Sequence, residues 1–244
     1  MTTIQSNLQG VQTRMAAACT QAGRPVDSVC LLAVSKTFGP EAVAQAWAAG
    51  QQAFGENYIQ EGVEKIQTLR TLHPQARLEW HCIGPVQSNK TRLVAAHFDW
   101  VQSVDRLKIA QRLSEQRPEA LPPLQLCLQV NVDGGANKSG VAPDEVLALA
   151  EAVATLPRVR LRGLMCIPEP AEGFAAQRAL FARAKGLFDD LNARGFALDT
   201  LSMGMSDDLE AAVAAGSTLV RVGRAVFGHR PGKEPVTVSV AGSA

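Results

Sequence analysis

Lys36 is the residue of this sequence best placed to act as a nucleophile. It follows the apolar segment LLAVS (31–35), so a strand ending here would leave the lysine amine at the strand's C-terminal end. Partial burial at such an edge disfavours the ammonium form, and the free amine is the group that forms a Schiff base with an aldehyde. The position alone is equally compatible with a lysine that extends into solvent while its aliphatic stem packs on the surface.

Two later segments could bind a phosphate group. In MGMSDDLEAA (203–212) an apolar segment leads into a helix that we expect to begin at Ser206, and in VRVGRAVFG (220–228) Gly223 follows another apolar segment. Backbone N–H groups at a helix N-terminus and in a glycine turn commonly bind phosphate. An ordinary helix cap and an ordinary turn would explain each feature separately. Together with a Schiff-base lysine, a phosphate site predicts pyridoxal phosphate (PLP) as the cofactor.

The elements that would position these residues are eight short apolar segments with helical patterns between them. Several segments are apolar at consecutive positions, as expected for parallel strands buried on both faces. This alternation predicts an α/β protein with one domain, a (β/α)8 TIM barrel over residues 1–230, with an extra N-terminal helix at 3–21 and a tail at 231–244. Because the second and fourth segments are short, an open sheet lacking one or two strands is the structural alternative. The eight segments are 29–35, 52–54, 79–84, 100–104, 124–132, 159–167, 200–205 and 217–223.

The composition of the 244 residues argues against several classes of protein. A net charge of +1 and a pI of about 7.7 are unlike those of proteins that bind nucleic acid or anionic membranes. No stretch approaches the roughly 18 consecutive apolar residues of a membrane span. The N-terminus lacks the basic and apolar regions of a signal peptide. We therefore expect a cytoplasmic protein with neither a nucleic-acid nor a membrane partner.

The five cysteines do not indicate a disulfide framework or a metal site. Their number is odd, and none has the spacing of a zinc ligand pair. Cys30, Cys82, Cys127 and Cys166 lie within apolar segments, where cysteine usually packs as a small apolar residue. We therefore expect buried free thiols at these four positions and no bound metal.

Seven motifs occur in a characteristic order along the chain. They are LLAVSKTFG (31–39), FGENYIQE (54–61), WHCIGPVQSNK (80–90), QVNVDGGANKSG (129–140), GLMCIP (163–168), LSMGMSDDLEAA (201–212) and RVGRAVFG (221–228). This set resembles the YggS/PROSC family of pyridoxal phosphate homeostasis proteins, from about residue 4 to residue 229. The resemblance implies the barrel of the alanine racemase N-terminal domain, which is fold type III among PLP proteins. It also implies a role in intracellular PLP homeostasis.

The resemblance assigns the residues that contact the reactive part of the cofactor. Lys36 would hold PLP as an internal aldimine, and Arg221 would face the pyridine nitrogen. A guanidinium is a donor that stays protonated, so the pyridine ring would remain neutral. A neutral ring is a poorer electron sink than a pyridinium. Asn57 and His81 would line the cofactor side of the cavity.

The resemblance also assigns the phosphate contacts. Ser206 and the backbone amides of Gly223 and Arg224 would hold the phosphate group. Many relatives carry a small hydroxyl residue where this chain has Arg224. A backbone contact survives that difference, whereas a hydroxyl bond to the phosphate would be replaced by one from the guanidinium.

The family is credited with cofactor binding and with no catalytic reaction, so we expect a PLP carrier without catalytic residues. The alternative is a PLP-dependent racemase or lyase of the alanine racemase fold. A two-base racemase takes a tyrosine from an additional domain, for which 244 residues leave no room, and Tyr58 is the one tyrosine of this chain. A further alternative is a barrel whose phosphate site binds an ordinary sugar phosphate or serves only as an interaction surface. We expect a monomer whose partners are PLP and apo forms of PLP-dependent enzymes.

Overall fold

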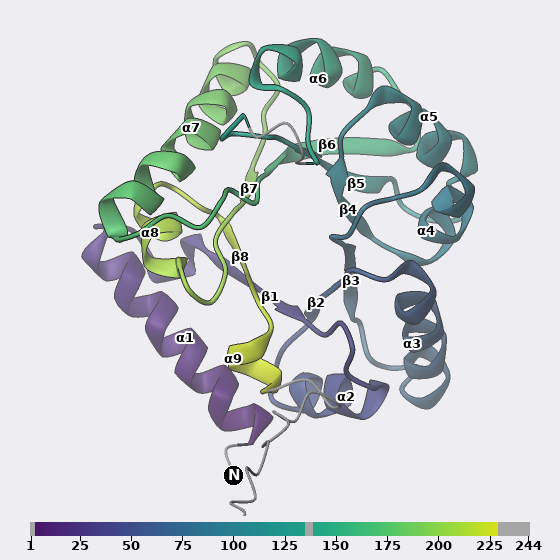
Figure 1. Ribbon diagram of the computed structural model, residues 1–244. Coiled ribbons are helices and arrows are strands. Elements are labelled where there is room, and N and C mark those ends of the chain that lie inside the picture. The colour runs from purple at the N-terminus through teal and green to yellow at the C-terminus, as the bar shows by residue number, and fades with distance from the viewer. Residues whose placement is uncertain (1–2, 135–138, 229–244) are drawn as a thin grey trace, which may run out of the picture.

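The computed structural model describes residues 3–134 and 139–228, and its centre is a closed barrel of eight parallel strands (Figure 1). Each strand pairs with the next one in sequence, and the last pairs with the first through Cys30↔Leu219 to Ala33↔Val222. The barrel prediction is therefore confirmed, and the short second and fourth segments both form strands. The strands are β1 (Cys30–Val34), β2 (Ala53–Glu56), β3 (Glu79–Cys82), β4 (Trp100–Val104), β5 (Leu124–Gln129), β6 (Val159–Met165), β7 (Thr200–Ser202) and β8 (Leu219–Val222).

Helices form a ring around the barrel. The N-terminal helix begins after Thr3, whose hydroxyl oxygen accepts from the Ser6 N–H while the Ser6 hydroxyl oxygen accepts from the Thr3 N–H. Figure 1 shows this helix in the outer ring, where it packs against the last two of the described helices, α8 (Leu209–Ala214) and α9 (Arg224–Phe227). The helices are α1 (Ile4–Gln21), α2 (Pro40–Ala48), α3 (Ile59–Leu72), α4 (Thr91–His97), α5 (Leu107–Gln116), α6 (Val146–Ala154), α7 (Phe174–Ala193), α8 (Leu209–Ala214) and α9 (Arg224–Phe227).

The two faces of each strand have different surroundings. Because side chains alternate along a strand, Val220 and Val222 of β8 pack outward against the helices, whereas Leu219 and Arg221 point into the barrel. The interior holds two small apolar clusters, Leu32, Val34, Ile83 and Leu219 in one and Trp100, Cys127 and Met165 in the other. Buried polar side chains share this interior, among them His81, Gln102, Ser202 and Arg221.

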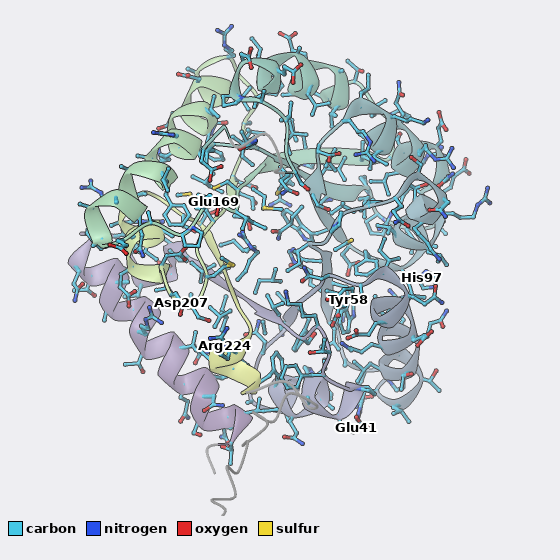
Figure 2. The ribbon with its side chains drawn as sticks, viewed as in Figure 1. Glu41, Tyr58, His97, Glu169, Asp207 and Arg224 are labelled. Atoms are coloured by element: carbon cyan, nitrogen blue, oxygen red, sulfur yellow. The ribbon has the colours of Figure 1, made fainter. Side chains whose placement is uncertain are left out.

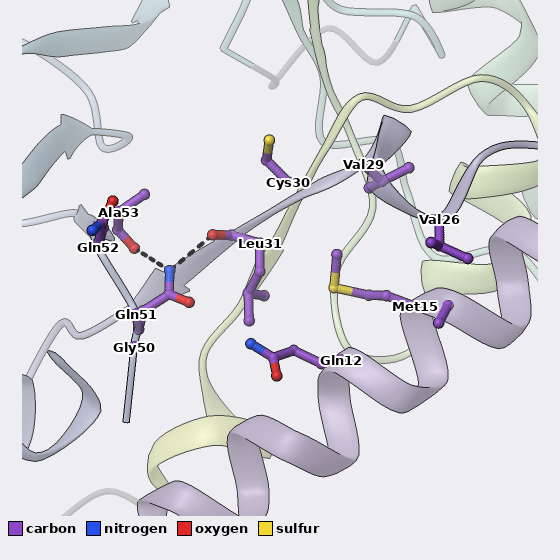
Figure 3. Close-up of a pocket in the computed structure, with 11 residues that line it drawn as sticks. Gln12, Met15, Val26, Val29, Cys30, Leu31, Gly50, Gln51, Gln52 and Ala53 are labelled. Atoms are coloured by element: carbon purple, nitrogen blue, oxygen red, sulfur yellow. Dashed lines mark hydrogen bonds between the residues drawn. The ribbon is translucent and has the colours of Figure 1, made fainter. Parts of the chain in front are cut away.

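The cysteine predictions are confirmed at three of four positions. Cys82, Cys127 and Cys166 are buried, and burial raises the pKa of the Cys82 and Cys127 thiols to about 12. The prediction for Cys30 is wrong, because this residue is exposed. It is the first residue of β1, so its side chain lies at the N-terminal end of the barrel, beside a cavity of about 360 Å³ next to α1 (Figure 3). All five cysteines are free.

Two features are absent from the described part of the chain. Within residues 3–134 and 139–228, no helix combines the length and apolar character that crossing a membrane requires. The same residues contain no group of three His, Cys, Asp or Glu side chains arranged to hold a metal ion. The tail predicted at 231–244, the boundary at residue 230 and residues 135–138 of the QVNVDGGANKSG motif lie outside the described residues.

Candidate cofactor-binding site

A cavity of about 570 Å³ lies at the C-terminal ends of β1, β2, β7 and β8. Apolar side chains, Phe38, Ile83, Ile167 and Met205 among them, form part of its wall. Six of the seven residues that the sequence assigned to a cofactor also line this cavity, and His81 does not. The six are Lys36, Asn57, Ser206, Arg221, Gly223 and Arg224.

The backbone on both sides of Lys36 is fixed by side chains of α3. Lys36 follows the end of β1 and is half-buried. The carbonyl oxygen of Ser35 accepts a hydrogen bond from Lys65 Nζ at 2.9 Å, and the N–H of Thr37 donates to Glu61 Oε1 at 2.6 Å. Thr37 has a φ of 70°, a conformation that is costly for a β-branched residue. The α3 contacts therefore hold a strained turn that directs Lys36 toward the cavity.

Lys65 belongs to a buried cluster of charges behind this turn. Its Nζ lies 2.6 Å from Glu56 Oε1 and 3.2 Å from Glu61 Oε1, and Ser35 Oγ donates to Glu56 Oε1 at 2.6 Å. The Lys65 and Glu56 side chains are 3% and 0% exposed. Burial raises the pKa of Glu56, and attraction to Lys65 opposes that rise. Only the Glu61–Lys65 spacing of four residues was a visible signal of this cluster in the sequence.

The segment that carries Ser206 is a turn rather than the start of a helix. We expected a helix to begin at Ser206, but α8 begins at Leu209, so that expectation is wrong. The physical reason is the side chain of Asp208, whose Oδ1 accepts from the Met205 N–H at 2.6 Å and closes a turn before the helix. Ser206 thus lies on a loop at the cavity wall.

Gly223 and Arg224 connect β8 to α9 at the same wall. A Cβ atom on Gly223 would lie 3.1 Å from the carbonyl oxygen of Val34, so a side chain here would press against β1. The first N–H groups of a helix lack intrahelical acceptors, which leaves those at the start of α9 available to a ligand. The Arg224 side chain is exposed. Figure 2 shows Asp207 and Arg224 on the side of the barrel that α1 flanks, with Tyr58 across the barrel.

Helix α1 supports both loops of this wall. Arg14 donates to the two carboxylate oxygens of Glu210 at 2.5 and 2.6 Å and to the carbonyl oxygen of Ser206 at 2.6 Å. Asn7 Nδ2 donates to the carbonyl oxygen of Val226 at 2.9 Å. The hydrogen bond from Arg14 lowers the pKa of Glu210. Sequence reasoning missed these residues because nothing local distinguishes them from other polar residues of an amphipathic helix.

Arg221 is a buried charged residue that lines the cavity. It is 4% exposed, and its Nη1 and Nη2 donate to Ser202 Oγ at 2.7 Å and to the carbonyl oxygen of Cys166 at 2.9 Å. Burial lowers the pKa of the guanidinium, but an arginine side chain still offers only donors. Any ligand atom that meets Arg221 must therefore be a hydrogen-bond acceptor.

His81 and Asn57 differ in their relation to the cavity. His81 is fully buried deeper in the barrel, where its ring stacks on Trp100 with centroids 5.0 Å apart. Asn57 lines the cavity, and its buried Oδ1 has no hydrogen-bond partner among the described residues. An unpaired buried acceptor is costly, so Asn57 is suited to receive a hydrogen bond from a ligand. Tyr58 is 54% exposed and is not part of the cavity wall.

Comparison with known proteins first defines the class to which this fold and site correspond. The family model of the alanine racemase N-terminal domain matches residues 4–231. The pyridoxal phosphate homeostasis protein of Pseudomonas aeruginosa is 60% identical, over 94% of this chain and 97% of that protein. The protein of the same name from Vibrio cholerae is 54% identical, over 94% and 98%. The chain belongs to the family of pyridoxal phosphate homeostasis proteins.

Solved structures agree with this family and with the barrel. PipY of Synechococcus elongatus, in a structure with PLP bound, is 38% identical and superimposes with a TM-score of 0.75, covering 88% of this chain and all of that one. The structure of PipY without PLP gives a TM-score of 0.80, over 92% of this chain and all of that one. An alanine racemase of Clostridium difficile gives a TM-score of 0.71 at 14% identity, covering 90% of this chain and 57% of that one. The racemase shares the fold of this chain.

Proposed function

We propose that this protein binds PLP in the 570 Å³ cavity and serves as a cofactor carrier in PLP homeostasis. The observation that carries the proposal is that Lys36 lines one cavity together with Ser206, Gly223 and Arg224. Lys36 offers an amine, and the other three residues offer hydrogen-bond donors that suit a phosphate group. The names of the curated relatives and the PLP-bound structure of PipY support it.

The described side chains suit the chemical groups of PLP. When bound, the cofactor supplies an aldehyde, and Lys36 Nζ would attach to its carbon with loss of water as a Schiff base. Ser206 and the amides of Gly223 and Arg224 would hold the phosphate. Arg221 would donate to the ring nitrogen, and Asn57 Oδ1 would accept from a polar hydrogen of the ligand.

The missing second base is the stronger argument for a carrier over a two-base racemase, and the donor at the ring nitrogen bears on the electronics of the cofactor. A donor at the pyridine nitrogen keeps the ring neutral, and a neutral ring withdraws electrons weakly from a bound amino acid. Tyr58, the candidate second base of a racemase, is exposed and outside the cavity wall. The carrier would work in the cytoplasm as a monomer and pass PLP to apo forms of PLP-dependent enzymes.

Binding is tested by titrating the purified protein with PLP and recording the absorbance of a lysine-bound cofactor. Wild type and Lys108→Ala, which removes an exposed lysine of α5, should both develop the band, and Lys36→Ala should not. A wild type that remains colourless would refute the proposal.

Two further assays separate the carrier from its alternatives. A loaded carrier should restore activity to an apo PLP enzyme in the presence of a trap for free cofactor. Deuterium exchange at the α-carbon of amino acids should stay at the level of free PLP. Exchange that is well above this level and depends on Lys36 would instead favour the racemase or lyase.

A further inference from the structure

A continuous chain of hydrogen bonds runs through the barrel interior from Arg221 to Glu79. Arg221 Nη1 bonds to Ser202 Oγ at 2.7 Å, and Ser202 Oγ bonds to Gln102 Oε1 at 2.7 Å. Gln102 Nε2 lies 2.8 Å from His81 Nδ1, and His81 Nε2 lies 2.8 Å from Glu79 Oε1. The chain connects the cofactor cavity with the opposite end of the barrel, because Arg221 lines the cavity and Glu79 begins β3.

We call this series of hydrogen-bonded side chains, from Arg221 to Glu79, the relay. Its three middle members, Ser202, Gln102 and His81, are each fully buried and come from three different strands. Water therefore has no access to complete their hydrogen bonds, so the partners within the relay must satisfy them. The Glu79 side chain is 49% exposed and forms the solvent end.

The chemistry of the two ends permits one direction of donation. Arginine has no acceptor, so Ser202 Oγ accepts from Arg221 and its hydroxyl hydrogen must go to Gln102 Oε1. With its oxygen toward Ser202, Gln102 presents its N–H to His81, and Nδ1 must therefore carry a lone pair. The reversed amide would point an N–H at Ser202 Oγ and leave the buried hydroxyl hydrogen without an acceptor in the relay.

The solvent end requires the same direction. His81 with an unprotonated Nδ1 carries its hydrogen on Nε2, which donates to Glu79 Oε1. That hydrogen bond lowers the pKa of Glu79. At neutral pH the Glu79 side chain is therefore ionised, so it can accept a hydrogen bond but cannot donate one. Protonation of His81 at Nδ1 would set two N–H groups against each other. The geometry of the two hydrogen bonds therefore places the ring hydrogen of His81 on Nε2.

We infer that Gln102 is a positioning residue for the cofactor: through Ser202 it fixes the orientation of Arg221, and through His81 it fixes the neutral Nε2–H tautomer. The part that concerns the cofactor rests on the proposed function, whereas the tautomer of His81 is a property of the protein alone. Arg221 presents its remaining donors to the cavity in a geometry set by the relay. The electronic state of a bound pyridine ring thus depends on a residue that does not line the cavity.

Gln102→Glu tests this inference because a carboxylate can accept from Ser202 but, when ionised, cannot donate to His81. Gln51→Glu is the matched control, since Gln51 is a buried amide whose Nε2 donates to the carbonyl oxygens of Leu31 and Ala53, outside the relay (Figure 3). The first measurement is the nitrogen NMR spectrum of the histidine rings without PLP. His81 should show the Nε2–H tautomer in wild type and Gln51→Glu, and a protonated Nδ1 in Gln102→Glu. A protonated Nδ1 in wild type would overturn the inference.

The second measurement is PLP binding by the same three proteins. The dissociation constant of Gln102→Glu should rise roughly tenfold, the equivalent of one hydrogen bond to a charged group, and the absorbance maximum of the bound cofactor should shift. Unchanged affinity and absorbance would overturn the positioning role even if the tautomer is correct. Absence of PLP binding by wild type would overturn the proposed function and the cofactor part of the inference, while the tautomer result stands on its own.

A smaller substitution covers the case in which Gln102→Glu does not fold. Ser202→Ala introduces no charge and removes the hydroxyl that fixes the Gln102 amide. Glu79 still accepts from His81 in this variant, so His81 should keep the Nε2–H tautomer in the protein without PLP. Arg221 loses the acceptor of its Nη1, so its side-chain NMR signals should shift and the dissociation constant for PLP should rise. Unchanged Arg221 signals and unchanged PLP affinity in Ser202→Ala would overturn the positioning role, and loss of the Nε2–H tautomer would overturn the inferred direction at the Glu79 end.

Discussion

Lys65→Met should destabilise the protein strongly, because it leaves a buried carboxylate without its cation. Methionine retains most of the aliphatic volume but removes the ammonium group 2.6 Å from Glu56 Oε1. Breaking a buried ion pair in this way costs about 3–5 kcal/mol. For a domain of this size each kcal/mol lowers the Tm by about 2–4 °C, so we expect a decrease of roughly 6–20 °C. The turn that carries Lys36 should loosen as well, because Lys65 also donates to the Ser35 carbonyl oxygen.

The pH dependence of this loss has a definite sign. Burial raises the pKa of Glu56 in the folded protein above its value in the unfolded chain. As the pH is raised, the carboxyl therefore ionises at a lower pH in the unfolded chain than in the folded protein. The free energy of unfolding falls as the pH rises from the unfolded to the folded pKa. Removing Lys65 raises the folded pKa further and widens that window upward. The deficit of Lys65→Met relative to wild type should therefore be larger at alkaline than at acidic pH.

Denaturant unfolding of a double-mutant cycle measures the effect. Glu56→Gln removes the buried carboxylate that Lys65→Met leaves unpaired. The double variant, with both substitutions, should therefore recover more than half of the stability lost in Lys65→Met. Lys185→Met is the control, because Lys185 forms an exposed ion pair with Asp189 at 2.6 Å and should change stability by less than about 1 kcal/mol. Additive losses in the cycle, or a loss in Lys65→Met no larger than in the control, would refute the reasoning.

Three further predictions concern other parts of the site and the barrel. Arg14→Met should lower the free energy of unfolding by about 1 kcal/mol at pH 7. Because Arg14 lowers the pKa of Glu210, wild type loses this contribution as the pH falls below about 4.3. The stabilities of the two proteins in urea unfolding should therefore converge in acid, and a difference that does not depend on pH would contradict this. Gly84→Ala should cost about 3 kcal/mol or more in the same assay, since its Cβ would lie 2.1 Å from the Asn57 carbonyl oxygen, and a fully stable variant would show that this contact is absent. Cys30 should react with a thiol reagent in the native protein. Partial desolvation and the charge of Glu79 raise its pKa, so the reactive thiolate should form, and the rate should rise, at a higher pH than for a free thiol. Cys30→Ser should remove this reaction, and equal labelling of the buried thiols would contradict the prediction.

The fold was largely predictable because its signals are local. Each strand is a short apolar segment between polar turns, and each of the eight predicted segments overlaps an observed strand. The incorrect predictions lie at the first residues of a strand and of a helix, where a single residue decides whether a side chain is buried or where the helix begins. Cys30 is exposed because it is the first residue of its strand, and α8 begins three residues after Ser206 because Asp208 closes a turn.

Of the candidate site, the sequence allowed prediction of residues that line the cavity but not of the residues that support them. Lys36 and Gly223 are visible in the sequence because each directly follows an apolar segment. The groups that hold them are not, because their partners are distant in the chain: Arg14 reaches Glu210 across 196 residues, and Ser202 meets Gln102 across 100. Such pairs depend on how the barrel closes. His81 was expected at the cofactor, whereas the structure places it two hydrogen-bonded side chains away from Arg221.

The central claim is that Lys36 holds PLP, and the most direct test is to locate the bound cofactor by mass. The protein is incubated with PLP, reduced with borohydride and digested, and the peptides are measured by mass spectrometry. We expect the added mass of reduced pyridoxal phosphate to lie on Lys36, and we expect Lys36→Ala to carry none at the same cofactor concentration. A modification located on another lysine, or an unmodified wild-type protein, would contradict the claim.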